Sequence, residues 1–412
     1  MRLGPLLALL LLVAAPGRAE TLNAWVEAVG GGYALRAIAT ESCPAATVDG
    51  TDIPLAPRAG ASEAFPVVSC QAALPPGAKT VRLGSLALKP PGPFNRIVVL
   101  GDTGCRLKGS FVQDCNDPVK WPFAGVAAQA AAEHPDLVVH VGDYYYRETP
   151  CPADRTGCAG SDSGDRWPSW REDFFDPARP LLEAAPWIFV RGNHEQCGRG
   201  ADGWFRFLAA AGTPATCPAT DRPFAVPAGR LTFYVLDSAD TDDDKAPPAK
   251  VALFRDQIEA LKPLIRTRPG WILTHRPIWG FTPEHSGEVG ESDELPVNRT
   301  EQKSVEGEPL GAVELILSGH VHIFTAASFG KARPAQLIVG NGGDVRDGEL
   351  PGSQSKPVSI AGLPAQTFVV EQFGYLVLDR APHGWNGTLH DVRGGVMATC
   401  SIAGRDIACA GS

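Results

Sequence analysis

The sequence predicts an α/β domain preceded by a small β domain. From Arg96 onward, apolar runs typical of buried strands alternate with segments typical of helices, which is the pattern of an α/β fold. Before that point, residues 20–92 contain short alternating segments separated by Gly and Pro turns, as in a compact β domain. The segment KPPGP (89–93) lies between the two regions and has the composition of a linker.

The α/β region contains two clear helical segments. Residues 123–134 are rich in alanine, the best helix former. Residues 251–265 repeat apolar side chains at helical spacing and therefore predict an amphipathic helix. Between these helices, the acidic run TDDDK (241–245) predicts a solvated loop. The predicted strands are RIVVL (96–100), DLVVHV (136–141), WIFVR (187–191), WILT (271–274) and VELILS (313–318).

The N-terminal 19 residues have the features of a signal peptide. A short basic start precedes an apolar run (6–15) that is too short to span a bilayer, and the small residue Ala19 suits cleavage after it. An uncleaved membrane anchor is the alternative, which the short run and the cleavage-like site disfavour. No other stretch is apolar enough to cross a membrane. We therefore expect a secreted or periplasmic protein without a stable membrane span.

The composition of the mature chain is acidic. Removal of the leader takes away Arg2 and Arg18 and leaves 35 cationic against 46 anionic residues, a net charge of −11. Such a surface argues against nucleic acid as a partner, because nucleic acid is itself a polyanion. The sequence gives no indication of the oligomeric state.

Ten cysteines in an exported chain predict disulfides. A thiolate metal site is the alternative, but the chain has no CxxC doublet. The cysteines fall into neighbouring couples, and local pairing is the simplest connectivity, although the sequence leaves the connectivity open: Cys43/Cys70, Cys105/Cys115, Cys151/Cys158, Cys197/Cys217 and Cys400/Cys409. Two sequons, at Asn298 and Asn386, have meaning only in a eukaryotic secretory pathway.

Polar side chains follow each of the five predicted strands. Ligands of α/β folds bind beyond the carboxyl ends of the strands, and in four of the five places a glycine lets the backbone turn and leaves room for a ligand. The segments are Gly101-Asp102, Gly142-Asp143, Gly192-Asn193, His275 and Gly319-His320-Val321-His322. Carboxylate, imidazole and amide oxygen are metal ligands. Two carboxylates with several histidines can hold two metal ions, and such a pair suits phosphoryl transfer to water.

The order GD…GD…GNHE…H…GHxH resembles the calcineurin-like metallophosphoesterase superfamily over roughly residues 96–380. Gly104 stands where most members have a histidine ligand. The spacing Gly142-Asp143-x-x-Tyr146 instead resembles the purple acid phosphatase branch, in which a tyrosine replaces that imidazole. The resemblance implies an α/β sandwich with two central sheets at 93–395, after the small β domain. A disulfide-closed tail at 396–412 would follow it.

The resemblance also implies a set of site residues. Fe(III) would be held by Asp102, Asp143, Tyr146 and His322, and a divalent ion (Zn, Mn or Fe) by Asp143, Asn193, His275 and His320. A phenolate is a hard anionic donor that favours ferric iron. His194 would contact phosphate and assist the leaving group. His285 resembles a second substrate histidine, and a solvated loop histidine is the alternative reading. Tyr144 and Tyr145 are expected to be packing residues.

The function that follows is an exported bimetal phosphoesterase, similar to acid phosphatases. It would hydrolyse small phosphate monoesters by attack of a metal-bound hydroxide. The chain shows no serine or cysteine nucleophile motif that would compete. A phosphodiesterase or nucleotidase on the same site is the nearer alternative. A non-catalytic surface or periplasmic binding protein on the same fold is the second.

Overall fold

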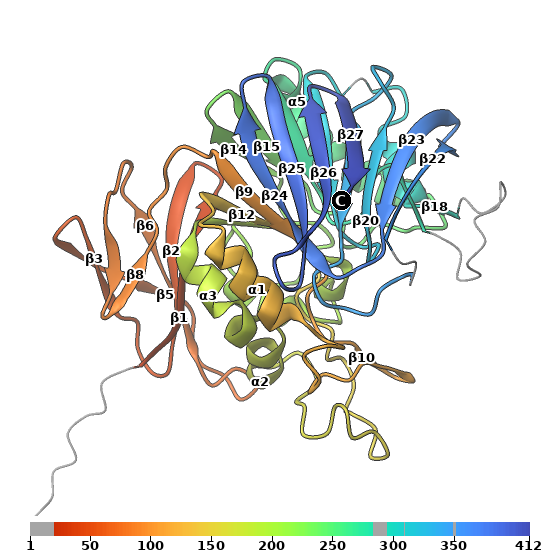
Figure 1. Ribbon diagram of the computed structural model, residues 1–412. Coiled ribbons are helices and arrows are strands. Elements are labelled where there is room, and N and C mark those ends of the chain that lie inside the picture. The colour runs from red at the N-terminus through yellow and green to blue at the C-terminus, as the bar shows by residue number, and fades with distance from the viewer. Residues whose placement is uncertain (1–19, 283–294, 309, 349–351) are drawn as a thin grey trace, which may run out of the picture.

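A computed structural model describes residues 20–282, 295–308, 310–348 and 352–412 (Figure 1). Two large sheets form the centre of the molecule. The first has the strand order β27 (Asp406–Gly411), β26 (Val396–Ala403), β25 (Gly384–Asp391), β24 (Gly374–Ala381), β9 (Arg96–Leu100), β12 (Leu137–His140), β13 (Trp187–Phe189), β1 (Thr21–Val29), β2 (Gly32–Ala39), β6 (Val68–Leu74) and β5 (Ala56–Ala59). The second has the order β14 (Phe224–Ala228), β15 (Leu231–Val235), β16 (Gly270–Leu273), β19 (Val313–Ser318), β21 (Ala335–Val339), β20 (Phe324–Ser328), β23 (Leu363–Val370) and β22 (Ser353–Ile360).

Smaller elements surround these sheets. The helices are α1 (Phe123–Ala132), α2 (Trp167–Trp170), α3 (Asp176–Ala184), α4 (Ala201–Phe207), α5 (Pro248–Ile265) and α6 (Arg299–Ser304), with short irregular helices η1 (Arg171–Phe175) and η2 (Asn193–Glu195). The remaining strands are β3 (Ala45–Val48), β4 (Thr51–Pro54), β7 (Val81–Leu83), β8 (Leu86–Leu88), β10 (Leu107–Lys108), β11 (Phe111–Val112), β17 (Gly280–Thr282) and β18 (Leu295–Val297). Helices α1 and α5 confirm the two helical segments predicted from the sequence. The predicted fold class, an α/β sandwich with a β-rich N-terminal region, is also confirmed.

The main core lies between the two sheets. In β9, Ile97 and Val99 face the second sheet, whereas Val98 and Leu100 pack against α1 and α3 on the outer side. Figure 1 shows α1, α2 and α3 on that outer face. Successive side chains of a strand point to opposite faces, so a strand buried on both sides must be apolar throughout. This explains the unbroken runs RIVVL and LVVH, which the sequence shows in place of an alternating pattern.

Strands from residues 20–92 extend the first sheet. Strand β1 pairs in parallel with β13, and β2, β6 and β5 follow in antiparallel order, while β3, β4, β7 and β8 form a separate sheet. In β1 and β2, Glu27 and Arg36 form a buried ion pair of 2.9 Å. Arg36 and Arg58 both donate to the carbonyl of Ala209, just after α4, at 3.4 and 2.5 Å. These contacts fasten the N-terminal strands to the α/β region. The boundaries at 92/93 and 395/396 remain predictions.

Five disulfides join the neighbouring couples proposed from the sequence, and no described cysteine is free. Asn298 is buried, and its side-chain oxygen accepts from the Glu301 N–H at 3.3 Å to cap α6, so this sequon is inaccessible in the folded chain. Asn386 is exposed in β25. Within the described residues, no helix has the length and apolar character needed to cross a membrane. The expected leader, residues 1–19, lies outside the described residues.

Candidate metal centre

The polar strand ends meet at one edge of the two sheets. Strands β9, β12 and β13 are parallel, as are β16, β19 and β21, so their carboxyl ends point the same way within each sheet. The backbone turns sharply there, with positive φ at Asp102 (56°), Asp143 (59°) and His320 (73°). A side chain on Gly142 would lie 2.3 Å from the His275 ring. Glycine is therefore required where these segments approach one another.

The first group of donors surrounds the Tyr146 hydroxyl. Its Oη lies 2.8 Å from Asp143 Oδ2, 3.2 Å from Asp102 Oδ1 and 3.0 Å from His322 Nε2. All four side chains are buried. These are the four residues that the family resemblance assigned to ferric iron, and the structure brings them together.

The second group lies on the other side of Asp143. Ligand atoms of Asp143, His275 and His320 all lie within 4.8 Å of one another. His275 Nε2 is 3.1 Å from Asp143 Oδ2 and 3.0 Å from Asn193 Oδ1. Asp143 Oδ2 thus contacts both Tyr146 and His275 and lies between the two groups of donors.

The donor set fits a pair of cations. Burial raises the pKa of Asp102, and burial reinforced by Asp143 and Asp102 raises the pKa of Tyr146 well above its usual value. Burial alone would raise the pKa of Asp143, but His275 and His194 outweigh burial and hold this pKa well below its ordinary value. A buried phenol beside two carboxyl groups loses its proton only when a cation takes its place. Oxygen donors and imidazoles together suit hard and borderline metal cations.

Each metal-facing histidine has one ring nitrogen fixed by an acceptor. His275 Nδ1 donates to the Val141 carbonyl at 2.8 Å, and His322 Nδ1 donates to the Val345 carbonyl at 2.7 Å. The Nε2 atoms of these two rings therefore remain for a metal. Such acceptors set the tautomer and orientation of a ligating imidazole.

His320 is oriented by Asp243, a residue whose role the sequence reasoning missed. The sequence predicted that residues 241–245 form a solvated loop, and this prediction is wrong for Asp243. Asp243 is two-thirds buried, forms an ion pair with Arg276, and places Oδ2 3.1 Å from His320 Nε2. Nδ1 of His320 is then the nitrogen left for a metal. One feature of the sequence could have indicated this role. The acidic run follows the strand-end segment YVLDS (234–238), which lies on the same sheet edge as the other polar segments.

Two buried carboxylates fix the turn that carries Asp143 and Tyr146. Glu195 accepts from the backbone N–H of Asp143 at 3.1 Å and of Tyr144 at 2.9 Å. Asp173 accepts from the N–H of Tyr146 at 2.8 Å and also pairs with Arg147. These bonds hold the donor atoms in place before any metal arrives, which limits the cost of ordering the site.

The other two tyrosines of this turn are packing residues, as expected. Tyr144 stacks on His140, with ring centroids 4.0 Å apart, and donates to the Val190 carbonyl at 2.9 Å. Tyr145 stacks on Trp170 at 5.7 Å. In the described chain, both hydroxyls donate to backbone carbonyls and not to the donors of the metal centre.

His194 lies beside both groups of donors. Its backbone N–H donates to Asp143 Oδ1 at 2.8 Å, and its Nε2 lies 4.0 Å from Asp143 Oδ2. Nδ1 lies 2.7 Å from Glu148 Oε1, which also pairs with Arg199. Burial lowers the pKa of His194 to about 4, although Asp143 and Glu148 act in the opposite direction. His285, the second candidate, lies outside the described residues.

Comparison with known proteins gives the class of this fold and site. The family model of the calcineurin-like phosphoesterases matches residues 95–324, more than half of the chain. The chain belongs to the calcineurin-like phosphoesterase family.

Among solved structures, the fold is similar to that of a purple acid phosphatase, PPD1, from yellow lupin (Lupinus luteus) seeds. That match has 15% identity and a TM-score of 0.56, and covers 95% of this chain and 74% of the lupin chain. PhoD matches with 14% identity and a TM-score of 0.54, over 95% of this chain and 92% of PhoD. At these identities the likeness shows a shared fold. No curated protein matches the chain by sequence.

Proposed function

We propose that the protein is an exported phosphoesterase that uses two metal ions to hydrolyse small phosphate monoesters, in the manner of a purple acid phosphatase. The observation that carries the proposal is the place of Asp143, whose Oδ2 contacts Tyr146 Oη at 2.8 Å and His275 Nε2 at 3.1 Å. One carboxylate between a phenol group and an imidazole group supports a mixed pair, Fe(III) with a divalent ion such as Zn, Mn or Fe.

The ligand assignment follows the two groups of donors. Asp102, Asp143, Tyr146 and His322 would hold the ferric ion, and Asp143, Asn193, His275 and His320 the divalent ion. When bound, such a pair polarises phosphate oxygens and lowers the pKa of a water molecule, which supplies the nucleophile. The chain's own contribution is to fix the geometry, through Glu195, Asp173 and Asp243.

His194 is the proposed proton donor to the departing oxygen. Nδ1 lies 2.7 Å from Glu148 Oε1 and 2.8 Å from the Arg199 guanidinium. When Nδ1 accepts from the guanidinium, the ring proton is on Nε2, which can deliver it on the side of the metal centre. Arg199, paired with Glu148, keeps that carboxylate in place. A positioned general acid matters most when the leaving alkoxide is strongly basic.

Export is supported by the five disulfides, which persist in oxidising compartments, and by the expected leader at 1–19. Mass spectrometry of the exported protein should show an N-terminus near Glu20 and no free thiol. An intact leader, or several free thiols, would count against export.

Turnover of 4-nitrophenyl phosphate compared with bis(4-nitrophenyl) phosphate tests the substrate class. The proposal predicts a higher kcat/KM for the monoester, with both metals bound. A reversed preference would favour a phosphodiesterase, and nucleotides added to the comparison would identify a nucleotidase. No hydrolysis of any ester by the metal-loaded protein would favour the non-catalytic binding protein.

A further inference from the structure

The Arg106 side chain lies against the tyrosine side of the metal centre. Its guanidinium is 5.1 Å from the centre of the Tyr146 ring and 3.5 Å from Nδ1 of His322. Asp344 pairs with this guanidinium and balances its charge. The Arg106 side chain is 23% exposed, so solvent reaches the tyrosine side of the centre along it.

A second arginine lies on the side of the centre from which the alcohol would leave. Arg199 pairs with Glu148, and Glu148 Oε1 lies 2.7 Å from Nδ1 of His194, the proposed proton donor. The side chains of Arg199 and Glu148 are 16% and 17% exposed, so solvent reaches this side as well. Here too, a carboxylate balances the charge of the arginine.

Lys108 extends from the same hairpin segment as Arg106. The pairing of β10 with β11 continues at Arg106, whose carbonyl accepts from the Gln113 N–H at 2.8 Å. Alternate side chains of an extended segment point to the same face. Leu107 is fully buried on the opposite face, whereas Lys108 is exposed. The Leu107 carbonyl accepts from the Glu148 N–H at 3.0 Å, so the backbone next to Lys108 lies beside Glu148.

Lys108 is the cation on this side whose charge is not balanced. Burial of part of the side chain and Arg199 lower the pKa of Lys108, and Arg106 acts in the same direction. Glu148 and Asp143 act in the opposite direction. The ammonium group is therefore within electrostatic reach of the metal centre. In the part of the chain that the structure describes, Lys108 forms no ion pair with a carboxylate, so its charge is available to a ligand.

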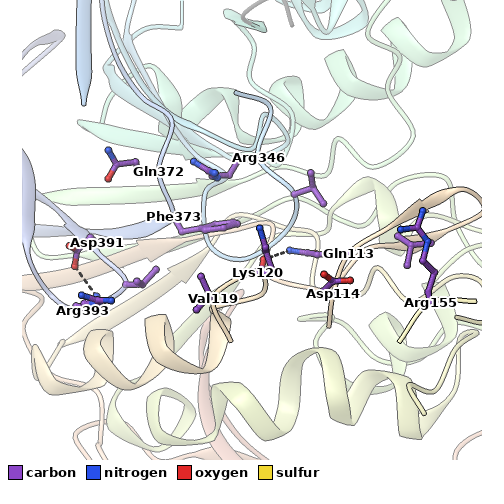
Figure 2. Close-up of a pocket in the computed structure, with 13 residues that line it drawn as sticks. Gln113, Asp114, Val119, Lys120, Arg155, Arg346, Gln372, Phe373, Asp391 and Arg393 are labelled. Carbon is purple, nitrogen blue, oxygen red and sulfur yellow. Dashed lines mark hydrogen bonds between the residues drawn. The ribbon is translucent and has the colours of Figure 1, made fainter. Parts of the chain in front are cut away.

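A pocket of about 650 Å³ lies on a different side of the metal centre (Figure 2). Val345 and Gln113 line this pocket and separate it from the centre. Among the described residues, none of the proposed metal ligands lines the pocket. We therefore expect a substrate bound to the metals to extend toward Lys108 and not into this pocket.

We propose that Lys108 binds a second anionic group on the alcohol part of the substrate and thereby favours phosphate monoesters that carry such a group. The inference rests on the proposed phosphomonoesterase function and narrows its substrate class. With the reacting phosphate on the metals and His194 at the leaving oxygen, the alcohol part extends past Glu148 toward the hairpin that carries Lys108. The attraction involves an exposed charge, so it should fall as salt screens that charge.

Matched aryl phosphates test the role of Lys108. The 3- and 4-carboxyphenyl phosphates are compared with the uncharged 3- and 4-carbamoylphenyl phosphates, so that two positions of the charge are sampled in substrates of similar size. For at least one position, the ratio of kcat/KM for the carboxylate to kcat/KM for the amide should fall about two- to fivefold in Lys108→Gln, as expected for loss of an exposed charge pair. Lys108→Glu should lower this ratio further, because its carboxylate repels the anion. Lys108→Arg keeps the charge and should keep the ratio near the wild-type value.

Lys120→Gln is the matched control, because Lys120 is an exposed lysine that Figure 2 shows in the separate pocket. It should leave the ratio unchanged. The same ratio in the wild type, Lys108→Gln and Lys108→Glu would overturn the role of Lys108 and leave the proposed function standing. An equal fall in Lys120→Gln would overturn that role as well, since it would show a general effect of charge.

Binding of phosphonates separates failure of this inference from failure of the function. The 3- and 4-carboxyphenylphosphonates and their carbamoyl counterparts have no ester bond to hydrolyse. Calorimetry with the metal-loaded protein should show, for at least one position, that Lys108→Gln weakens binding of the carboxylate relative to the amide by about two- to fivefold. If no ester is hydrolysed, the proposed function fails, and this measurement alone decides the role of Lys108. Equal relative binding in the wild type and Lys108→Gln, or no binding of any phosphonate, would then overturn that role as well.

Discussion

Removal of Asp243 should weaken binding of the divalent ion without affecting the tyrosine site. Asp243 Oδ2 lies 3.1 Å from His320 Nε2, and the Arg276 guanidinium lies at the same distance from that nitrogen. The carboxylate accepts the Nε2 proton and leaves Nδ1 free for a metal. In Asp243→Ala, only Arg276 remains near Nε2, and it can only donate. A donor at Nε2 favours the tautomer of His320 that carries its proton on Nδ1, and Nδ1 is the atom that the metal needs.

The expected magnitude is a 10–100-fold rise in the Kd of the divalent ion, which is the usual effect of losing the partner of a ligating histidine. Asp243→Asn should fall between the wild type and Asp243→Ala, because its amide oxygen can still accept but carries no charge. Competitive titration with a chelator of known zinc affinity measures this Kd. Iron content should stay at the wild-type level, since no contact joins Asp243 to Tyr146 or His322 among the described residues.

Asp244→Ala is the control, because this neighbour in the same acidic run is exposed. Its divalent-ion Kd should match that of the wild type. An unchanged Kd in both Asp243 variants would refute the orienting role and would mean that His320 keeps its tautomer without help. An equal loss of iron and of the divalent ion would instead indicate general disruption of the site.

Three further variants test separate parts of the site and fold. His194→Ala should keep both metals but lose about 10²–10⁴-fold in turnover, less for good leaving groups, and equal losses for good and poor leaving groups would point to phosphate binding instead. Tyr146→Phe should lose ferric binding and the visible tyrosinate band, whereas Tyr145→Phe should keep both; a band that persists in Tyr146→Phe would show that another residue is the ligand. Burial raises the pKa of Glu301 from 4.5 to about 8, so the folded chain holds a proton that the unfolded chain releases, and this group's contribution to stability falls between pH 4.5 and 8. Glu301→Gln should therefore match the wild-type Tm near pH 4.5 and exceed it at pH 8, and a pH-independent difference in Tm would contradict this.

The donors of the metal centre could be predicted because they follow strands of a recognisable kind. Strands buried on both faces read as continuous apolar runs, and parallel strands bring their carboxyl ends to one edge. The approach of Asp102 to Asp143 thus follows from local patterns and strand direction, whereas Tyr146 was identified by the family resemblance. The cysteine couples were predictable for a similar reason, since each closes a short loop.

Features that depend on loops or distant pairing could not be predicted. Asp243 belongs to a run of acidic residues, and nothing in the local pattern shows which of them turns inward to His320. Strand β1 pairs with β13 across a sequence separation far beyond any local signal.

Metal content measured together with hydrolysis, in the wild type and in Asp143→Asn, tests most directly whether one carboxylate serves two metal ions. The wild-type protein should contain two ions per chain and should hydrolyse 4-nitrophenyl phosphate. Asp143→Asn replaces the shared oxygen that contacts Tyr146 and His275, so it should hold one ion at most and lose most of its turnover. Two ions per chain with near-normal turnover in Asp143→Asn would contradict the shared-carboxylate site.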